Sequence, residues 1–327
     1  MKIDLLKIIP GNVRIQLDEV TQNKLLDEAM KISGKQKNLA KILNLSRLSI
    51  YYLLSKSSRP TLETLKKLME ITKMEIDSQE LSLSMEASNR QIKVKRYIEI
   101  DEEFMWFLGF WEGDNSDNTN NLGVGNTDIN ISRRAFNFLK SFIGENEISV
   151  RFEFSPQIKI TEEVVNDMAK KIGIKKCRSI TAINKKGRNK TFIELKIYST
   201  PLKKTFLKIR ELLRNKLVKM PENLKIMFLQ GFFDADGSIN IKKQIATYWQ
   251  KGNQKGYENL KLVKNLLNSL KIKSSKIKIQ NKKRDIIRLD VLKGQKGKNI
   301  SLFIKIGSTS IEKSEKMKIV NLLLLRH

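Results

Sequence analysis

The sequence predicts an α+β fold in which one α/β unit occurs twice, preceded by a small all-helical domain. The segments FLGFWEGDNS (Phe107–Ser116) and FLQGFFDADGS (Phe228–Ser238) nearly repeat each other. The patterns after each segment also recur, which indicates an internal duplication. The first part of the chain instead spaces its apolar residues as amphipathic helices do.

These patterns divide the 327 residues into four segments. A chain of this length accommodates two or three domains, since one domain usually takes about 100–200 residues. The polar stretch 78–94 has no clear period and predicts a linker. The predicted boundaries are a helical domain at 1–85, a linker at 86–98, a first repeat at 99–216 and a second repeat at 217–327.

The N-terminal segment has the order helix, tight turn, helix, helix. Asn23–Ile32 and the residues from Leu39 to Leu43 have helical spacing. Ser46 suits the N-cap of a helix at Arg47–Leu54, and a further helix, Leu62–Ile71, follows a Pro-Thr start. The order is that of a helix-turn-helix.

This segment resembles the small phage-repressor-like DNA-binding domains. Ile50 and Leu53 should point inward. The resemblance therefore implies that the DNA contacts come from Arg47, Ser49, Tyr51 and Tyr52. An ordinary helical bundle without a DNA role is the alternative.

Each repeat begins with an apolar helix that ends in an aspartate. The first should comprise Glu102–Asp114, an Asn-rich hairpin to Asp128, Arg133–Ile143, Ile148–Phe154, an inserted helix at Glu162–Ile172, Phe192–Tyr198 and Leu202–Leu213. The second should comprise Glu222–Asp236, Ser238–Trp249, Tyr257–Leu270, Lys276–Gln280, Ile286–Leu292, Ile300–Ile306 and Ile311–Leu324.

The two acid-ended helices are apolar all round, so both should be buried and packed together. Small residues on one stripe of each helix would let the backbones approach closely: Gly109, Gly113, Gly231 and Ala235. Close packing brings Asp114 and Asp236 to one end of the pair. Carboxylates are unfavourable at helix C-termini, so we expect a divalent cation between them, and a small set of hard oxygen ligands suits Mg²⁺.

The formal charge of +28 predicts a polyanionic partner, with nucleic acid ahead of an anionic membrane. The chain has one cysteine, Cys177, and one histidine, His327, which excludes an internal disulfide and a Cys/His zinc site. No apolar run approaches the ~20 residues that span a bilayer, and no signal peptide is evident. We therefore expect a cytoplasmic, nucleoid-associated protein without a membrane partner or a small-molecule substrate.

The duplicated motif resembles the LAGLIDADG homing endonucleases, over about residues 99–327. LGVGNTD (Leu122–Asp128) and Leu195–Ser199 also resemble family segments. The resemblance implies two αββαββα repeats about a pseudo-dyad, with saddle-shaped antiparallel sheets on DNA. It implies a site-specific double-strand endonuclease and a monomer with an internal pseudo-dimer.

For the site, the resemblance implies that Asp114 and Asp236 bind the catalytic metal, Mg²⁺ or Mn²⁺, with the carbonyls of Gly113 and Ala235. The family also uses a basic residue of the fourth strand, and Lys196 matches in the first repeat. The aligned residue of the second repeat is Asp290, with Arg288 and Lys293 nearby, and we carry Lys293 as the candidate. These differences predict unequal cutting of the two strands.

Alternation along strands predicts a DNA-facing side in the second repeat. Its expected DNA contacts are Asn240, Lys242, Thr247, Trp249, Lys251, Lys282, Lys283 and Arg284. Two other functions stay open: a non-cleaving transcription regulator derived from a homing endonuclease, and a maturase that binds intron RNA.

Overall fold

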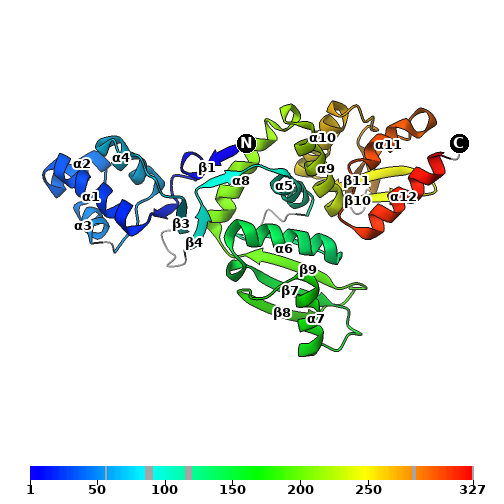
Figure 1. The fold of residues 1–327 in the computed structure, drawn as a ribbon, viewed down its shortest axis with the longest axis horizontal. Coiled ribbons are helices and arrows are strands. Elements are labelled where there is room, and N and C mark those ends of the chain that lie inside the picture. The colour runs from blue at the N-terminus through cyan, green and yellow to red at the C-terminus, as the bar shows by residue number, and fades with distance from the viewer. Residues whose placement is uncertain (56, 85–90, 115–119, 282–284, 326–327) are drawn as a thin grey trace. The chain divides into compact units, whose positions relative to one another are not determined.

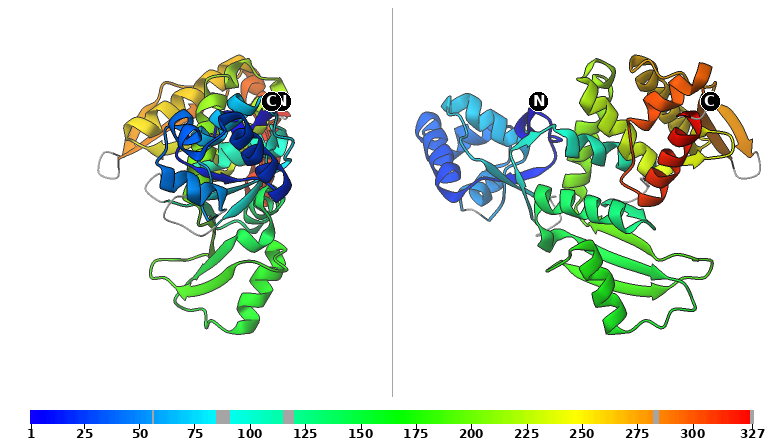
Figure 2. Two further views of the ribbon diagram at one scale, coloured as in Figure 1. Left: turned by 90° about the vertical axis from the view of Figure 1, so that its left-hand side faces the viewer. Right: turned by 45° about the vertical axis from the view of Figure 1, so that its right-hand side comes forward.

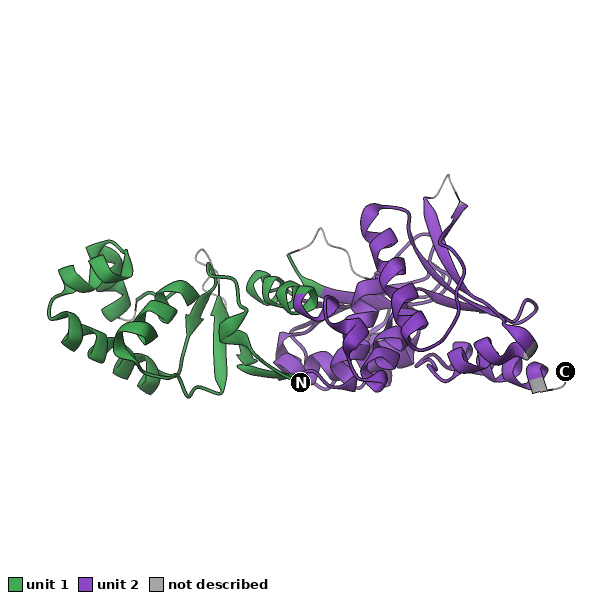
Figure 3. Ribbon diagram, turned by 90° about the horizontal axis from the view of Figure 1, so that it is seen from above, with its two compact units in different colours: residues 1–99, 120–122, 198–211 green, residues 100–119, 123–197, 212–327 purple. Residues whose placement is uncertain are grey.

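The structure is a computed structural model, which describes the chain except residues 56, 85–90, 115–119, 282–284 and 326–327. The chain forms two compact units, residues 1–99, 120–122 and 198–211, and residues 100–119, 123–197 and 212–327 (Figure 3). Most of α8 (Thr200–Arg214) belongs to the first unit. Among the helices of the described residues, none has the length and apolar character needed to span a membrane.

Besides α8, the first unit contains the helices α1 (Glu19–Ser33), α2 (Gln36–Leu43), α3 (Arg47–Leu54) and α4 (Leu62–Thr72). Asn44 ends α2 in the left-handed conformation at φ 56°, which Asn tolerates better than most residues. Ser46 then caps α3 by accepting the Ser49 N–H at 3.0 Å. The tight turn and the capped second helix therefore lie where the sequence predicts them.

The same unit also contains strands, so the prediction of an all-helical domain followed by an irregular linker was wrong. The strands are β1 (Lys2–Asp4), β2 (Arg14–Gln16), β3 (Glu80–Ser84), β4 (Ile92–Lys95) and β5 (Tyr97–Glu99), and a short 3₁₀ turn occupies Leu5–Lys7. Strand β3 pairs with β2 and β4, and β1 pairs with β5. Leu81 and Leu83 alternate with polar residues and are buried. This period of two is the feature that the linker prediction overlooked.

The first repeat begins with α5 (Glu102–Asp114), whose N-terminus is capped by Asp101, which accepts the Phe104 N–H at 2.8 Å. Then follow β6 (Leu122–Asn126), α6 (Ile129–Ile143), β7 (Ser149–Phe154), α7 (Glu162–Ile172), β8 (Ser179–Asn184) and β9 (Phe192–Ile197), with a 3₁₀ turn at Glu145–Glu147. The sheet order is β6-β9-β7-β8, with β8 parallel to β7. Helix α6 packs on β9 and α7 (Figure 2).

The second repeat begins with α9 (Glu222–Asp236), after a 3₁₀ turn at Leu217–Lys219. It continues through β10 (Gly237–Asn240), β11 (Ile245–Lys251), α10 (Gln254–Ser269), β12 (Lys278–Asn281), β13 (Ile286–Val291), a 3₁₀ turn at Gln295–Gly297, α11 (Lys298–Ile304) and α12 (Ile311–Leu325). Its sheet is antiparallel, in the order β10-β11-β13-β12. Strands β11, β13 and β12 thus correspond to β6, β9 and β7, and the two-repeat α+β fold agrees with the prediction. The first hairpin strand expected in repeat one falls on 115–119, outside the described residues.

The core of the second unit lies between α5 and α9, which are packed along their lengths (Figure 1). A Cβ on Gly109 would lie 2.0 Å from the Phe228 carbonyl oxygen, and one on Gly231 would lie 1.9 Å from that of Trp106. A Cβ on Gly113 would lie 2.5 Å from the Ala235 Cβ. The backbones therefore touch where the small residues occur, and the two C-terminal ends emerge together.

Candidate active site at the ends of the helix pair

The two repeated aspartates are the last residues of α5 and α9. The side chain of Gln250, on β11, connects the two helix ends. Its Nε2 donates to Asp236 Oδ2 and, at 3.3 Å, to the carbonyl oxygen of Gly113. Asp114 Oδ2 accepts the Gly125 N–H at 2.5 Å. One amide therefore spans the junction between the acid of one repeat and the backbone beside the other acid.

Both carboxylates have raised pKa values. Desolvation by the surrounding protein raises the pKa of Asp114 to about 8, with repulsion from Asp236 and Glu194 added and only the Gly125 N–H opposing. Asp114 keeps accessible surface towards the cleft, so this desolvation comes from protein atoms around the carboxylate and not from complete enclosure. Desolvation also raises the pKa of Asp236, to about 7, while Lys313 and Gln250 favour its charged form. Near neutral pH Asp114 thus favours its protonated form, while Asp236 is protonated and ionised in comparable amounts, unless a cation binds.

Lys313, in the first turn of α12, supplies the positive charge at the end of α9. Its Nζ donates to the carbonyl oxygens of Phe233 at 2.7 Å and Asp234 at 2.9 Å. A cation is the favourable partner of a helix C-terminus. Burial lowers the pKa of Lys313, although Asp234, Asp236 and Asp128 favour its charge. The α5 end has a neutral amide instead, because Asn259 Nδ2 donates to the Glu112 carbonyl at 3.2 Å.

The acids two positions before the terminal aspartates have structural contacts. Asp234 accepts from Trp106 Nε1 at 2.8 Å, from the Thr309 N–H at 3.0 Å and from Ser308 Oγ. Glu112 instead pairs with Arg214 at 3.2 Å. Trp106 belongs to α5, so its bond to Asp234 ties the first repeat to the second.

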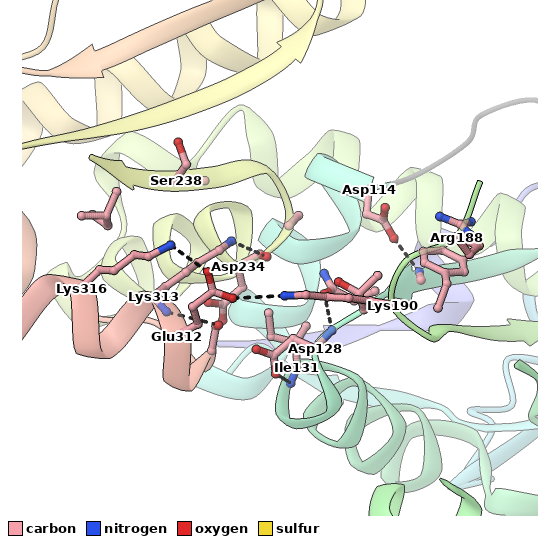
Figure 4. Close-up of a pocket in the computed structure, with 18 residues that line it drawn as sticks. Asp114, Asp128, Ile131, Arg188, Lys190, Asp234, Ser238, Glu312, Lys313 and Lys316 are labelled. Carbon is pink, nitrogen blue, oxygen red and sulfur yellow. Dashed lines mark hydrogen bonds and ion pairs between the residues drawn. The ribbon is translucent and has the colours of Figure 1, made fainter. Parts of the chain in front are cut away.

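A cleft of about 490 Å³ opens beside Asp114. Figure 4 shows Asp114 and Arg188 on one side of it, with Lys313, Lys316 and Glu312 on the other. Lys190 reaches across to Glu312, at 3.4 Å. The cleft therefore combines carboxylates with several cations, an arrangement suited to a phosphate and a metal ion.

The two repeats differ at one matched position beside the acids. Gly125 and Gln250 each lie three residues before the N-cap of the next helix, Asp128 and Asn253. In the second repeat the Gln250 side chain contacts Asp236. In the first, the absence of a side chain leaves room for Phe192, since a Cβ on Gly125 would lie 2.2 Å from the Phe192 Cζ.

The structure places neither predicted basic residue in a contact with the acids. Lys196 Nζ pairs with Glu194 at 2.7 Å. Lys293 is exposed, and its backbone carbonyl accepts the Ile300 N–H. Asp290, at the position aligned with Lys196, accepts from Thr247 Oγ1 at 2.9 Å and lies 3.4 Å from Arg288. The order of acid and base along the fourth strand is therefore reversed between the repeats.

The predicted DNA-contacting residues of the second sheet alternate as expected along β11. Thr247, Trp249 and Lys251 share one face, with Trp249 Nε1 donating to Ser238 Oγ at 2.9 Å. Lys251 is exposed, Trp249 is partly exposed and Thr247 is buried. Asn240 and Lys242 are exposed at the β10–β11 turn. Lys282, Lys283 and Arg284 lie outside the described residues.

In the first unit, the predicted contacts on α3 lie on its outer side. Arg47, Tyr51 and Tyr52 are exposed and Ser49 is partly exposed, while Ile50 and Leu53 are buried. The rings of Tyr51 and Tyr52 meet edge to face, 5.7 Å apart. This face can contact another molecule without unfolding the helices.

The donor set at the helix ends fits a hard divalent cation. It offers two carboxylates, and the neighbouring Gly113 carbonyl faces the same amide as Asp236. Nowhere in the part of the chain that the structure describes do three or more Asp, Glu, His or Cys side chains gather as a metal cluster. Mg²⁺ needs fewer protein ligands, because it retains several waters and is often held by one or two carboxylates. The expected metal contact of the Ala235 carbonyl stays a prediction.

Three residues at the site were missed at the sequence level: Gln250, Lys313 and Arg188. Gln250 was detectable, because aligning the repeats on their helix N-caps places it opposite Gly125. Lys313 was detectable as a cation in the first turn of a helix, where cations are unfavourable. Arg188 lay in a recognised basic run, 185–190, but only the fold brings it beside Asp114.

Comparison with known proteins bears on the second repeat. Residues 223–319 match the family model of the LAGLIDADG-like domain, which confirms the predicted resemblance for this part of the chain. No curated protein matches the chain. Solved structures of the homing endonuclease I-DmoI show low similarity to this chain.

The I-DmoI structure with DNA and manganese is 13% identical, covers 64% of this chain and 97% of its own, and has a TM-score of 0.35. That with DNA and calcium is 13% identical, covers 60% and 85%, and has a TM-score of 0.32. Variants of I-DmoI described as mesophilic are 12% identical, cover 63% and 90%, and have a TM-score of 0.36. These scores are too low to assign individual residues. The family match is thus confined to the LAGLIDADG-like domain at residues 223–319.

Proposed function

We propose that this protein is a divalent-metal-dependent endonuclease that cuts both strands of duplex DNA at a specific site. The observation that carries the proposal is the geometry of two aspartates, Asp114 and Asp236, which end two helices packed along their lengths. Gln250 joins Asp236 to the Gly113 carbonyl beside Asp114. The net charge of +28 and the LAGLIDADG-like domain of the second repeat support DNA as the substrate. Such an arrangement has no benefit for a protein that only binds.

Metal ions would be held at Asp114 and at Asp236, with the carbonyls of Gly113 and Ala235 as candidates for further contacts. When bound, Mg²⁺ or Mn²⁺ would polarise the phosphate and lower the pKa of water. Each carboxylate must lose its proton before it can hold a cation. Since their pKa values are about 8 and about 7, metal affinity should rise with pH through this range.

The reaction is hydrolysis, in which a water oxygen bonds to phosphorus, one P–O ester bond breaks and the leaving oxygen gains a proton. Gln250 positions Asp236, because its Nε2 donates both to Asp236 Oδ2 and to the Gly113 carbonyl. Lys313 holds the C-terminal turn of α9 through two carbonyls and keeps positive charge near Asp236. Lys196 can take the basic role in the first repeat only if it exchanges Glu194 for DNA. Lys293, which is exposed, stays the candidate in the second repeat.

DNA recognition is proposed for two surfaces. In the second repeat, Trp249, Lys251 and Asn240 would meet the groove, while Thr247, which is buried, would support the face. In the first unit, the exposed face of α3, with Arg47 and the two tyrosines, would act as a helix-turn-helix contact. Because both acid-ended helices belong to one chain, a monomer suffices to cut two strands.

A duplex library with random sequence, incubated with Mg²⁺ or Mn²⁺, tests the proposal. Sequencing of the ends should show discrete double-strand breaks at one related set of sites. The double substitution Asp114→Asn and Asp236→Asn should abolish them, while Asp167→Asn, in an exposed ion pair of α7, should not. Tight duplex binding without breaks would favour the regulator, and preference for intron RNA over duplex would favour the maturase.

A further inference from the structure

An arginine in the β8–β9 loop is held in a fixed orientation at the cleft. Arg188 Nε and Nη2 both donate to Glu153 Oε2, at 3.0 and 2.6 Å. The guanidinium also lies over the Phe192 ring, 4.2 Å from its centroid. Two hydrogen bonds and one ring contact fix its plane, so little further ordering is needed for it to bind a ligand.

Glu153 is fully buried and pairs with three cations. Besides Arg188, Lys185 Nζ lies 3.0 Å and Arg151 Nη2 lies 2.6 Å from Glu153 Oε1. Burial opposes ionisation of Glu153, but the bonds from Arg188 and Lys185 outweigh it and hold its pKa below the ordinary value. With three cations around one carboxylate, the local charge remains positive.

A continuous series of contacts joins this arginine to Asp114. Asp114 accepts the Gly125 N–H. The Cα of Gly125 lies against the Phe192 ring, where a side chain would collide. Phe192 in turn supports the guanidinium of Arg188. The position of Arg188 relative to Asp114 is therefore determined by packed groups on β6 and β9, and not by a free loop.

The remaining donor of this guanidinium is available to the cleft. Arg188 keeps 30% of its side-chain surface exposed and lines the cleft with Asp114. Its Nη1 makes no hydrogen bond to any residue that the structure describes. The neighbouring cations are engaged elsewhere, since Lys190 pairs with Glu312 and Lys196 with Glu194.

We propose that Arg188 contacts a DNA phosphate beside Asp114, and that Glu153 is the residue that positions it. This inference rests on the proposed nuclease function for the identity of the ligand. A guanidinium suits the role because it stays charged and recognises phosphate oxygens directionally, which a lysine does only as a point charge. Arg188 would then take, in the first repeat, the basic role that the sequence assigns to Lys196.

The first test measures duplex binding in EDTA, where no cleavage occurs. The probe is a short mixed-sequence duplex, titrated over a range of KCl concentrations. Arg188→Met should lower the slope of log affinity against log salt by about 1, the change expected for one lost phosphate contact. Lys171→Met, which removes a cation of α7 paired with Asp167, serves as the matched control. A slope equal to that of the control variant would overturn the contact.

The second test resolves cutting of the two strands, on a site obtained from the duplex library. Asp114→Asn identifies the strand whose cleavage depends on Asp114. Arg188→Met should slow cleavage of that same strand by about 100-fold, because one lost donor to a developing charge costs about that factor. The other strand should be cut at the wild-type rate. Equal slowing of both strands would overturn the assignment. Unfolding temperatures, measured in parallel, show whether each variant is folded.

Two conservative variants separate the phosphate contact of Arg188 from its positioning by Glu153. Arg188→Lys should keep the salt slope, because its charge remains, but should still slow the same strand, because the fork and its bonds to Glu153 are lost. Glu153→Gln should slow that strand while KM changes little. Full activity in both would contradict the proposal. If the wild-type protein cuts no duplex with either metal, the nuclease function fails, and the EDTA experiment still decides whether Arg188 binds phosphate.

Discussion

The two repeats present matching aspartates in different surroundings. Asp236 has an amide and a lysine near it, Gln250 and Lys313, whereas Asp114 has one backbone N–H and the repulsion of Glu194. The first repeat has Gly125 where the second has Gln250, and the Phe192 ring occupies the space beside Gly125. The backbone scaffold is therefore duplicated, while the groups that tune each acid are not. Similar packing with different electrostatics predicts two half-sites that act on similar bonds at different rates.

The largest loss of stability should come from changes in the packed helix pair, α5 and α9, which is the symmetric part of the molecule. Gly109→Ala and Gly231→Ala each place a Cβ within 2.0 Å of a carbonyl oxygen of the partner helix. The helices would have to separate, so each substitution should cost more than about 4 kcal/mol of unfolding free energy. Circular dichroism during thermal unfolding measures this.

The control for the glycines is Gly11→Ala, where nothing lies within 4 Å of the added Cβ. Its unfolding temperature should match that of the wild type. If only one of the two helix glycines proves essential, the packing is less symmetric than the contacts indicate.

The pH dependence of stability sharpens the electrostatic difference. A carboxyl whose folded pKa is raised binds more protons in the folded than in the unfolded state, so stability falls as pH rises from about 4 towards 8. The metal-free protein should therefore lose stability between these values, through Asp114 up to about pH 8 and through Asp236 up to about pH 7. Scanning calorimetry in EDTA at several pH values measures this.

Substitution by Asn assigns this loss to each acid. Asp114→Asn should raise the unfolding temperature at pH 8 by several degrees, and Asp236→Asn should raise it less, because Lys313 and Gln250 already favour the Asp236 charge. Mg²⁺ should stabilise the wild type but not the double variant. A wild-type protein that gains stability with rising pH would contradict the pKa assignments.

The hydrogen bond from Trp106 to Asp234 has no counterpart from the second repeat to the first. Trp106 Nε1 donates to the buried Asp234, while the position matching Trp106 in the second repeat is Phe228. Trp106→Phe should cost about 1–3 kcal/mol, since a buried acceptor loses a partner. Trp249→Phe, which removes a bond to Ser238 nearer the surface, should cost less. Urea unfolding compares the two, and equal costs would mean that the cross-repeat bond has no special weight.

The smallest effect is expected for the ion pair across the cleft. Lys190 and Glu312 are 70% and 60% exposed, and an exposed pair contributes about 0–1 kcal/mol. Lys190→Met, which leaves the Lys316–Glu312 pair intact, should leave the unfolding temperature within a degree or so of the wild type. A large decrease would show that this contact holds the repeats together.

The sequence predicted the parts of the molecule that depend on local pattern. The apolar helices, their small residues and their terminal acids follow from composition and spacing, and Ser46 acts as the expected cap. The strands around Leu81 and Leu83 were missed because four or five residues of alternation are a weak signal among polar neighbours. Gln250, Lys313 and Arg188 reach the acids through tertiary packing, which spacing along the chain does not encode.

Under the proposed function, each aspartate serves one DNA strand. This assignment is tested most directly by strand-resolved cleavage of a selected duplex with Mg²⁺, comparing Asp114→Asn with Asp236→Asn. Each variant should become a nicking enzyme, and the two variants should nick opposite strands. Loss of the same strand in both variants, or undiminished cutting of both strands in either one, would contradict it.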